Sequence, residues 1–322
     1  MVWCRTCLSG VHLPAFAAAD GGLFADRGVE VEFVDLMHAP DFSLQGFAMR
    51  PKAVAAGRAD FALTSVAYLL AAQTATGGRL PVRFAAISHQ RSPLCGVVRD
   101  DSELSDAHDL AGRRAARWRM PWFTADFAGA LEHVGIEAPV IVDMSEDLDV
   151  ALGRGEIDVI PTWIDMIFQH RDAGFSIRSI PLDIDVYTSG LVAADRLAPE
   201  LIASVREAFL AGFNLQLEQP DVGIAGFRRR YPDVSEAHIR ASWSRFQPYA
   251  FDRVPPGTMD ADRWDVTIEY TAKTHGLSAF PGERLYRPEL LTPPRAPSPA
   301  VGEGPLAPVY QLNARSGDRL PA

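Results

Sequence analysis

The sequence predicts a two-lobed α/β protein whose halves follow the same plan. The first observation is length, because 322 residues exceed one compact domain of roughly 150 residues and favour two units. The second is composition, with 48% apolar and 22% charged residues, which is typical of a soluble chain with a real core. The third is an internal repeat in which helices alternate with short strands.

The repeat joins two segments of similar sequence. Residues Ala53–Ser65 read AVAAGRADFALTS, and Ala151–Trp163 read ALGRGEIDVIPTW, so that Ala, Gly, Asp and Thr recur at one constant offset. Each copy is typical of a helix ended by glycine, a turn with an aspartate, a short buried strand and a threonine where the strand ends. Upstream, GVEVEFVD at 28–35 and GIEAPVIVD at 135–143 form a second matched pair.

This alternation indicates a sheet with crossover helices in each half. Ligands of open α/β sheets bind beyond the carboxyl ends of the strands. We therefore expect Thr64 and Thr162, which end the two copies, to face one cleft from opposite sides. The alternative is that two unrelated α/β units share this spacing by chance.

Charge and hydropathy exclude two classes of partner. The net charge is −10 and the basic residues are scattered apart from Arg228–Arg230, which predicts no nucleic-acid partner. Apolar runs such as Val66–Ala72 are far shorter than the roughly 20 residues of a membrane helix, which predicts no membrane insertion. Three cysteines make no disulfide framework and favour a reducing compartment.

The N-terminal stretch has no apolar core typical of an export signal, because Arg5, Ser9, His12 and Pro14 interrupt it. The chain as written is therefore expected to be cytoplasmic. It would be periplasmic or at the cell surface if the true N-terminus lies upstream. Cys4 and Cys7 would point to opposite faces of a strand, so we expect no metal site.

The stretch 12–35, HLPAFAAADGGLFADRGVEVEFVD, resembles the opening of the sulfonate- and thiamine-pyrimidine-binding family of ABC-transporter solute receptors. The matching features are Gly22, Phe24, Gly28 and an alternating strand at Val29–Val34. Further matches lie at AGRADFALT, Val98–Ser102, Asp109–Arg113, Gly155–Trp163 and Pro199–Pro220. Together they cover roughly residues 1 to 280.

The resemblance implies a two-lobed type II periplasmic-binding-protein fold, each lobe a mixed sheet flanked by helices. Lobe one would comprise residues 1–98 and 190–286, and lobe two residues 99–189. A Pro-rich tail at 287–322 is expected to be mobile. The resemblance also implies a small-molecule ligand, an ABC permease as partner and no cofactor.

Candidate ligand contacts of lobe one lie where strands end. His12 precedes Pro14 at a turn, and Thr64 and Ser65 stand where a helix begins and amide groups are exposed. Each has a structural alternative, a turn-satisfying histidine and a plain helix cap. The full set of candidates from this lobe and its crossings is Ser9, His12, Thr64, Ser65, Ser88, His89 and Thr188.

Lobe two offers a cation and flat apolar walls. Arg117, Trp118 and Trp122 crowd a strand-to-helix turn, and Trp163 and Asp165 follow the second repeat. An arginine beside tryptophans suits a flat, anionic or heteroaromatic ligand. The alternative is that these aromatic residues only join the lobes.

An enzyme on the same fold is the second hypothesis, because a fold does not fix function. A desulfinase of this fold uses a cysteine near the first strand, and Cys7 with His12, or with His38 and Arg50, would be the corresponding set. A pyrimidine-synthase-like activity is disfavoured, since Thr64 and Tyr68 stand where that relative has lysine and histidine.

Overall fold

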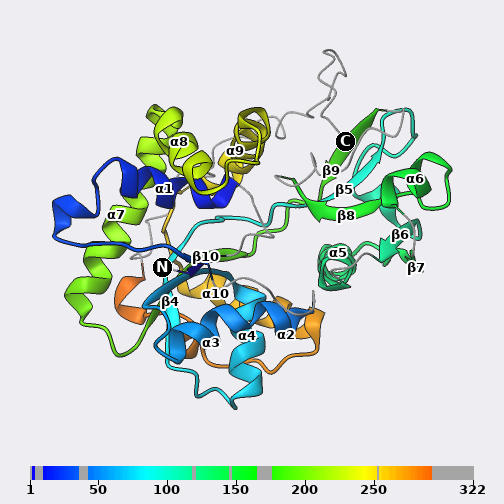
Figure 1. The fold of residues 1–322 in the computed structure, drawn as a ribbon. Coiled ribbons are helices and arrows are strands. Elements are labelled where there is room, and N and C mark those ends of the chain that lie inside the picture. The colour runs from blue at the N-terminus through cyan, green and yellow to red at the C-terminus, as the bar shows by residue number, and fades with distance from the viewer. Residues whose placement is uncertain are drawn as a thin grey trace, which may run out of the picture.

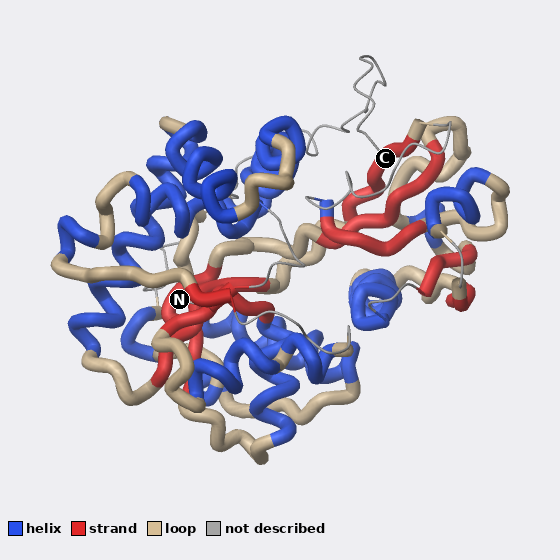
Figure 2. The backbone as a smooth tube through the Cα atoms, in the orientation of Figure 1, coloured by secondary structure: helices blue, strands red, loops and turns tan. Residues whose placement is uncertain are grey.

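The computed structural model describes residues 2–3, 10–35, 43–117, 121–144, 147–164, 176–251 and 254–291. Two lobes lie side by side, joined by two extended segments (Figures 1 and 2). Lobe one holds a five-stranded sheet in the order β2-β1-β3-β10-β4. Its strands are β1 (Val2–Trp3), β2 (Val34–Asp35), β3 (Phe61–Ser65), β4 (Val82–Ile87) and β10 (Ser189–Ala194).

Lobe two holds a three-stranded sheet in the order β8-β5-β9 and a β6-β7 pair. An isolated bridge between Ala115 and Val159 links the two. The strands are β5 (Leu94–Arg99), β6 (Arg114–Arg117), β7 (Val140–Asp143), β8 (Ile160–Trp163) and β9 (Ile177–Pro181). Because β5 pairs with β8 and β9, the outward crossing between the lobes lies at residues 88–93, just before the boundary expected at 98.

Helices cover both faces of the lobe-one sheet. One face carries α1 (Leu13–Asp20), α7 (Pro199–Glu218), α8 (Pro220–Arg230) and α9 (Glu236–Ala250). The other carries α3 (Met49–Ala55), α4 (Val66–Ala75) and α10 (Ala261–His275). The remaining helices are α2 (Leu44–Phe47), α5 (Pro121–His133) and α6 (Leu148–Gly153).

The pleat of β10 explains why the sheet is buried on both sides. Leu191 and Ala193 join the core under α1 and α7, whereas Val192 and Ala194 join the core under α4 and α10. Successive strand side chains point to opposite faces, so a continuous apolar run fits a strand covered on both faces. This strand returns from lobe two and runs antiparallel to β3 and β4, which makes the sheet mixed.

The two repeat copies fold alike. Gly57 lies two residues after the end of α3, with φ of 74°, and Gly155 lies two residues after the end of α6, with φ of 69°. Both values fall in the left-handed region that favours glycine. Each glycine leads into a buried strand, β3 and β8 respectively. The matched upstream pair gives β2 and β7, which run parallel to β1 and β6.

The strand expected at Val29–Val34 is shorter in the structure. Strand pairing covers only Val34–Asp35. Val29, Val31 and Phe33 nevertheless pack against the lobe-one core, so the alternating pattern reflects burial of one face without hydrogen-bonded pairing.

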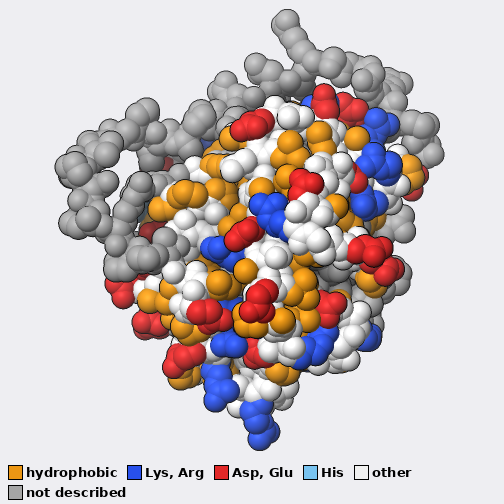
Figure 3. Space-filling view, turned by 90° about the vertical axis from the view of Figure 1, so that its left-hand side faces the viewer, with side chains coloured by type: hydrophobic (Ala, Val, Ile, Leu, Met, Phe, Trp, Pro, Cys, Tyr) orange, Lys and Arg blue, Asp and Glu red, His pale blue; other side chains and the backbone are white. Residues whose placement is uncertain are grey.

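Charges of both signs are interspersed on the face drawn in Figure 3. Ion pairs join α8 to its neighbours, with Arg228–Glu236 at 3.0 Å and Arg229–Asp20 at 2.5 Å. Among the described residues, no helix is both long enough and apolar enough to cross a lipid bilayer.

Candidate functional site

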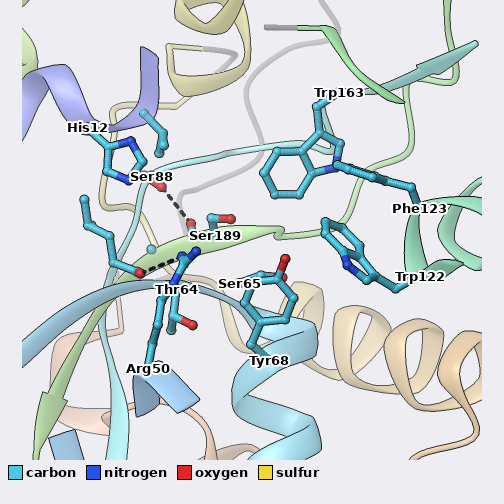
Figure 4. A pocket seen from close by; sticks show the side chains of 13 residues that line it. His12, Arg50, Thr64, Ser65, Tyr68, Ser88, Trp122, Phe123, Trp163 and Ser189 are labelled. Atoms are coloured by element: carbon cyan, nitrogen blue, oxygen red, sulfur yellow. Dashed lines mark hydrogen bonds between the residues drawn. The ribbon is translucent and has the colours of Figure 1, made fainter. Parts of the chain in front are cut away.

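A cavity that opens to solvent lies between the lobes, and its unfilled space, open solvent included, is about 480 Å³. Figure 4 shows polar side chains of lobe one facing aromatic side chains of lobe two across it. The lining residues are Val11, His12, Arg50, Leu63, Thr64, Ser65, Tyr68, Ser88, Trp122, Phe123, Trp163, Ser189 and Gly190. This set contains an arginine and a histidine but no carboxylate.

The end of β3 and the start of α4 form one wall. Ser65 caps α4, since its hydroxyl accepts a hydrogen bond from the Ala67 amide at 3.2 Å. The first amide groups of a helix carry a partial positive charge. Thr64, only 2% exposed, precedes the cap, and its Oγ1 has no hydrogen-bond partner among the described residues. This wall therefore suits an anionic group.

Arg50 adds a full positive charge to the same wall. The guanidinium extends from α3, and one nitrogen donates to the Leu63 carbonyl at 3.3 Å. Its carbon lies 5.6 Å from the ring centres of both Phe47 and Tyr68, close enough for cation–π attraction. These contacts hold the guanidinium at the wall of the cavity, which Thr64 also lines (Figure 4).

Lobe two supplies the flat wall. Trp122 and Phe123 come from the first turn of α5, with ring centres 3.9 Å apart. Trp163 comes from the end of β8 and lies 5.9 Å from Trp122 and 5.5 Å from Phe123. The indole Nε1 of Trp122 is buried, and no residue that the structure describes accepts a hydrogen bond from it. The wall thus combines aromatic faces with one available donor.

The aromatic contacts continue across the gap between the lobes. Tyr68 of lobe one lies edge-on to Trp122 at 5.4 Å and stacks on Phe47 at 5.0 Å. Such pairs contribute about 0.5–1.5 kcal/mol each beyond the area they bury. The cavity is therefore closed on this side by side chains from both lobes.

His12, Ser88 and Ser189 form the polar corner opposite this closure (Figure 4). The Ser88 hydroxyl donates to the Ser189 carbonyl at 2.9 Å, which ties the two crossing segments together. His12 is 4% exposed and is the last residue of the 3-10 turn Gly10–His12 that leads into α1.

His89 lies behind this corner and does not line the cavity. Its ring packs on Phe246 at 4.6 Å and contacts Trp163 at 5.8 Å. Burial, with a smaller contribution from the charge of His12, lowers the pKa of His89 to about 3. The imidazole is therefore neutral at physiological pH and serves the packing of the crossing.

The structure brings together part of the set expected from the sequence. His12, Thr64, Ser65, Ser88, Trp122 and Trp163 line the cavity. Cys7, Ser9, His38, Trp118 and Asp165 lie outside the described residues.

Besides His89, three of the expected ligand contacts lie outside the cavity lining. Thr162 is buried in β8 opposite Cys95, and because neighbouring side chains of a strand point to opposite faces, Trp163 takes the place expected for it. Arg117 is half-exposed and pairs with Asp143 at 3.1 Å. Thr188 lines a smaller adjoining cavity with Ser65 and Trp163.

Arg50, Phe123 and Gly190 line the cavity but were absent from the set expected as ligand contacts. The clearest available signal for Arg50 was an arginine at the start of the helical segment that leads into the first repeat. No local pattern marks Gly190, because its place depends on β10 pairing with β3.

Comparison with known proteins agrees with this architecture. The model of the family described as NMT1/THI5 like matches residues 9–222, about two thirds of the chain. The chain belongs to the NMT1/THI5-like family. This confirms the resemblance to sulfonate- and pyrimidine-binding receptors. A search of curated proteins found no match.

Solved structures share the fold of this NMT1/THI5-like protein at low identity. The periplasmic aliphatic sulphonate-binding protein SsuA of Escherichia coli has a TM-score of 0.63 at 15% identity, covering 91% of this chain and 95% of that one. The sulfonate-binding SsuA of Methylobacillus flagellatus KT gives 0.62 at 16%, covering 86% of each chain.

A third structure is a mutant of DszB in complex with biphenyl-2-sulfinic acid. Its TM-score is 0.57 at 16% identity, covering 90% of this chain and 96% of that one. These likenesses confirm the expected two-lobed periplasmic-binding-protein fold.

Proposed function

We propose that this NMT1/THI5-like protein is a solute receptor that closes on an anionic ligand with a flat, aromatic or heteroaromatic body. The observation that carries the proposal is that the two lobes line the cavity with different chemistry. Arg50 and Thr64 lie on lobe one, and the aromatic wall that includes Trp122 and Trp163 lies on lobe two. A ligand that spans the cavity would contact both lobes and so favour the closed arrangement.

The charges of the lining support an anion. Arg50 and His12 line the cavity without any carboxylate among the described lining residues. An arginine binds carboxylate, sulfonate or sulfinate oxygens through charge-assisted hydrogen bonds. The unpartnered Thr64 hydroxyl would donate a further hydrogen bond, which a buried polar group requires to offset its desolvation.

The flat wall supports an aromatic body. Trp122 stacks on Phe123, and Trp163 stands edge-on to both rings, so the wall offers a planar ring both face and edge contacts. The Trp122 indole nitrogen would donate to an acceptor on that ring. A purely aliphatic sulfonate would leave this wall without its partner.

The names of the structural neighbours favour transport. Two of them are sulfonate-binding proteins, described as periplasmic. By this analogy the protein would deliver its ligand to the permease of an ABC importer and would act outside the cytoplasmic membrane.

An aryl-sulfinate enzyme is the second candidate. The complex of the DszB mutant with biphenyl-2-sulfinic acid places a flat aryl anion on the same fold. The nucleophile expected here, Cys7, lies outside the described residues. Turnover of a bound sulfinate, abolished by Cys7→Ala, is the result that would favour this candidate.

Calorimetric titration with naphthalene-2-sulfonate as the probe tests the proposal. An alkyl sulfonate, a pyrimidine and 2-naphthol serve as comparison ligands. We expect the aryl sulfonate to bind most tightly and no product to form. Arg50→Gln should weaken its binding by about 1.5–3 kcal/mol, roughly 10- to 100-fold, as a lost charged hydrogen bond does.

The matched control is Arg196→Gln, which removes an arginine that pairs with Asp60 at 2.6 Å and does not line the cavity. It should leave the dissociation constant unchanged. Equal binding of 2-naphthol and the sulfonate, or full affinity in Arg50→Gln, would contradict the proposal.

A further inference from the structure

Helix α10 contributes to the cores of both lobes. Trp264 and Ile268 pack in the lobe-one core, whereas Tyr270 joins the core of lobe two. Its partner across the gap is α5, whose Phe127 belongs to the same lobe-two core. The α5–α10 contact is thus a direct link between the lobes, separate from the two crossing segments.

A buried ion pair stands at the centre of this link. His275 Nε2 lies 2.8 Å from Asp126 Oδ1, with side-chain exposures of 3% and 17%. The Tyr270 hydroxyl donates to the Asp126 carbonyl at 3.0 Å. His133 packs edge-on against Tyr270 at 5.3 Å. One residue of lobe two, Asp126, is therefore held by two residues of α10.

The two helices approach as closely as side chains allow. A Cβ atom at Gly129 would lie 2.5 Å from Thr274 Oγ1 and 2.7 Å from its Cγ2. Gly129 stands one turn after Asp126 on α5, so both residues present the same face to α10. The absence of a side chain at Gly129 permits the distance at which Asp126 reaches His275.

The same helix carries the flat wall of the cavity. Trp122 lies one turn before Asp126 on α5, and Phe123 follows it. None of Asp126, Gly129 and His275 lines the main interlobe cavity. Asp126 lines the smaller adjoining cavity, together with Tyr270 and Trp163. A displacement of α5 relative to α10 would carry Trp122 and Phe123 with it, because a helix of 13 residues moves as one rigid element.

We propose that Asp126, His275 and Tyr270 form an interlobe clasp that positions α5, so that Trp122 and Phe123 meet Tyr68 and enclose the ligand. These three are positioning residues, acting through Trp122 and Phe123. The effect of the clasp on affinity rests on the proposed function. Its effect on the separation of the lobes is independent of any ligand.

The test uses the full chain with Asp126→Asn, His275→Gln, the double variant and Gly129→Ala. Without ligand, we expect each to increase the radius of gyration measured by small-angle X-ray scattering. Hydrogen–deuterium exchange of α5 and α10 amides should rise in parallel. The methyl group of Gly129→Ala would push α5 away from Thr274 of α10 without changing Asp126 or His275. Because alanine is the better helix former, an effect of this variant is not due to a weakened α5 helix.

With naphthalene-2-sulfonate as probe, the dissociation constant should rise about tenfold in each ion-pair variant, within the range usual for coupled sites. The double variant should weaken binding no more than either single change, because both remove the same contact. The matched control is Asp158→Asn, which breaks the Arg114–Asp158 pair inside lobe two at 2.7 Å. It should leave lobe separation and affinity unchanged.

Unaltered lobe separation in all four variants would overturn the clasp, even if their melting temperatures fall. Weaker binding without a change in lobe separation would overturn it as well. If naphthalene-2-sulfonate and the other probes fail to bind the wild type, the receptor proposal fails. The scattering and exchange measurements then still decide the clasp.

Discussion

At the scale of single residues, the site contains buried polar atoms whose hydrogen bonds are not satisfied by their neighbours in the described part of the chain. Within the described part of the chain, the Oγ1 of Thr64 and the Nε1 of Trp122 are both buried without a hydrogen-bond partner. A buried polar group without a hydrogen bond costs about 1–3 kcal/mol. One such atom lies on each lobe. A ligand that hydrogen-bonds to both atoms would remove this cost and would thereby hold the two lobes together.

His89 illustrates a residue whose type suggested binding but whose burial gives it another role. In the sequence, His89 follows Ser88 at the end of a strand, and such hydrogen-bonding side chains are typical of ligand contacts. The ring is instead enclosed by Phe246 and Trp163. Its distance from the cavity follows from how α9 packs, which no local pattern encodes.

Acid stability should depend on His89. Its pKa is lowered by burial and by His12 from 6.5 to about 3 in the folded protein. The unfolded chain therefore binds more protons between these two values, and folding stability falls as pH drops from 6.5 toward 3. The contribution approaches about 1.4 kcal/mol per pH unit in that window.

Replacing the imidazole by an apolar ring, as in His89→Phe, should flatten this dependence. Urea unfolding at a series of pH values between 4 and 7 measures the slope for both proteins. Identical slopes would show that the buried imidazole is not the group responsible.

At the scale of elements, close helix packing depends on small residues at defined places. Gly212 of α7 faces α1, and a Cβ atom there would lie 2.1 Å from the Pro14 carbonyl and 2.9 Å from the Ala18 Cβ. The small residues Ala18 of α1 and Gly212 of α7 thus allow the backbones of the two helices to come into contact. This contact holds the helix that begins at the His12 turn.

Gly212→Ala should destabilise the protein by about 1–3 kcal/mol, since forced overpacking outweighs the gain of up to about 1 kcal/mol in helix propensity. Chemical denaturation measures the change. Asn214→Ala on the exposed side of the same helix is the control and should change stability by no more than about 0.7 kcal/mol. A stabilised Gly212→Ala protein would contradict the close approach of α1 and α7.

Elements with strong local signals were predicted well. The short buried strand of the first repeat, Phe61–Ser65, and the helix that begins after Ser65 lie where the sequence indicates them. The strand expected from Val29 shortened to Val34–Asp35, because period-2 burial requires an apolar neighbour but hydrogen-bonded pairing requires another strand in register.

At the scale of the whole molecule, the lobes are joined by two crossing segments and the α5–α10 contact. A ligand that contacts both lobes should stabilise the folded protein by about 2.7 kcal/mol when present at 100 times its dissociation constant. Thermal unfolding with increasing naphthalene-2-sulfonate measures this gain. In the double variant Trp122→Ala with Trp163→Ala, the gain should be lost.

That variant removes most of the lobe-two wall and leaves Arg50 in place, so it separates the contribution of the two lobes. Trp264→Phe, in the lobe-one core, is the control for removing a large aromatic side chain. It should lower stability yet preserve the ligand-induced gain. Wild-type affinity in the double tryptophan variant would place the ligand outside this cavity.

The sequence by itself determined the α/β class, the repeat and the family, because these depend on hydrophobic periodicity, glycine turns and short motifs within the chain. It also placed Thr64, Ser65, Trp122 and Trp163 at the ends of elements. Tertiary structure alone decided which of them meet. The choice of Trp163 over Thr162 depends on the pleat of β8, and the place of Arg50 depends on α3 packing beside β3. Such contacts join residues far apart in the chain, so local pattern carries no record of them.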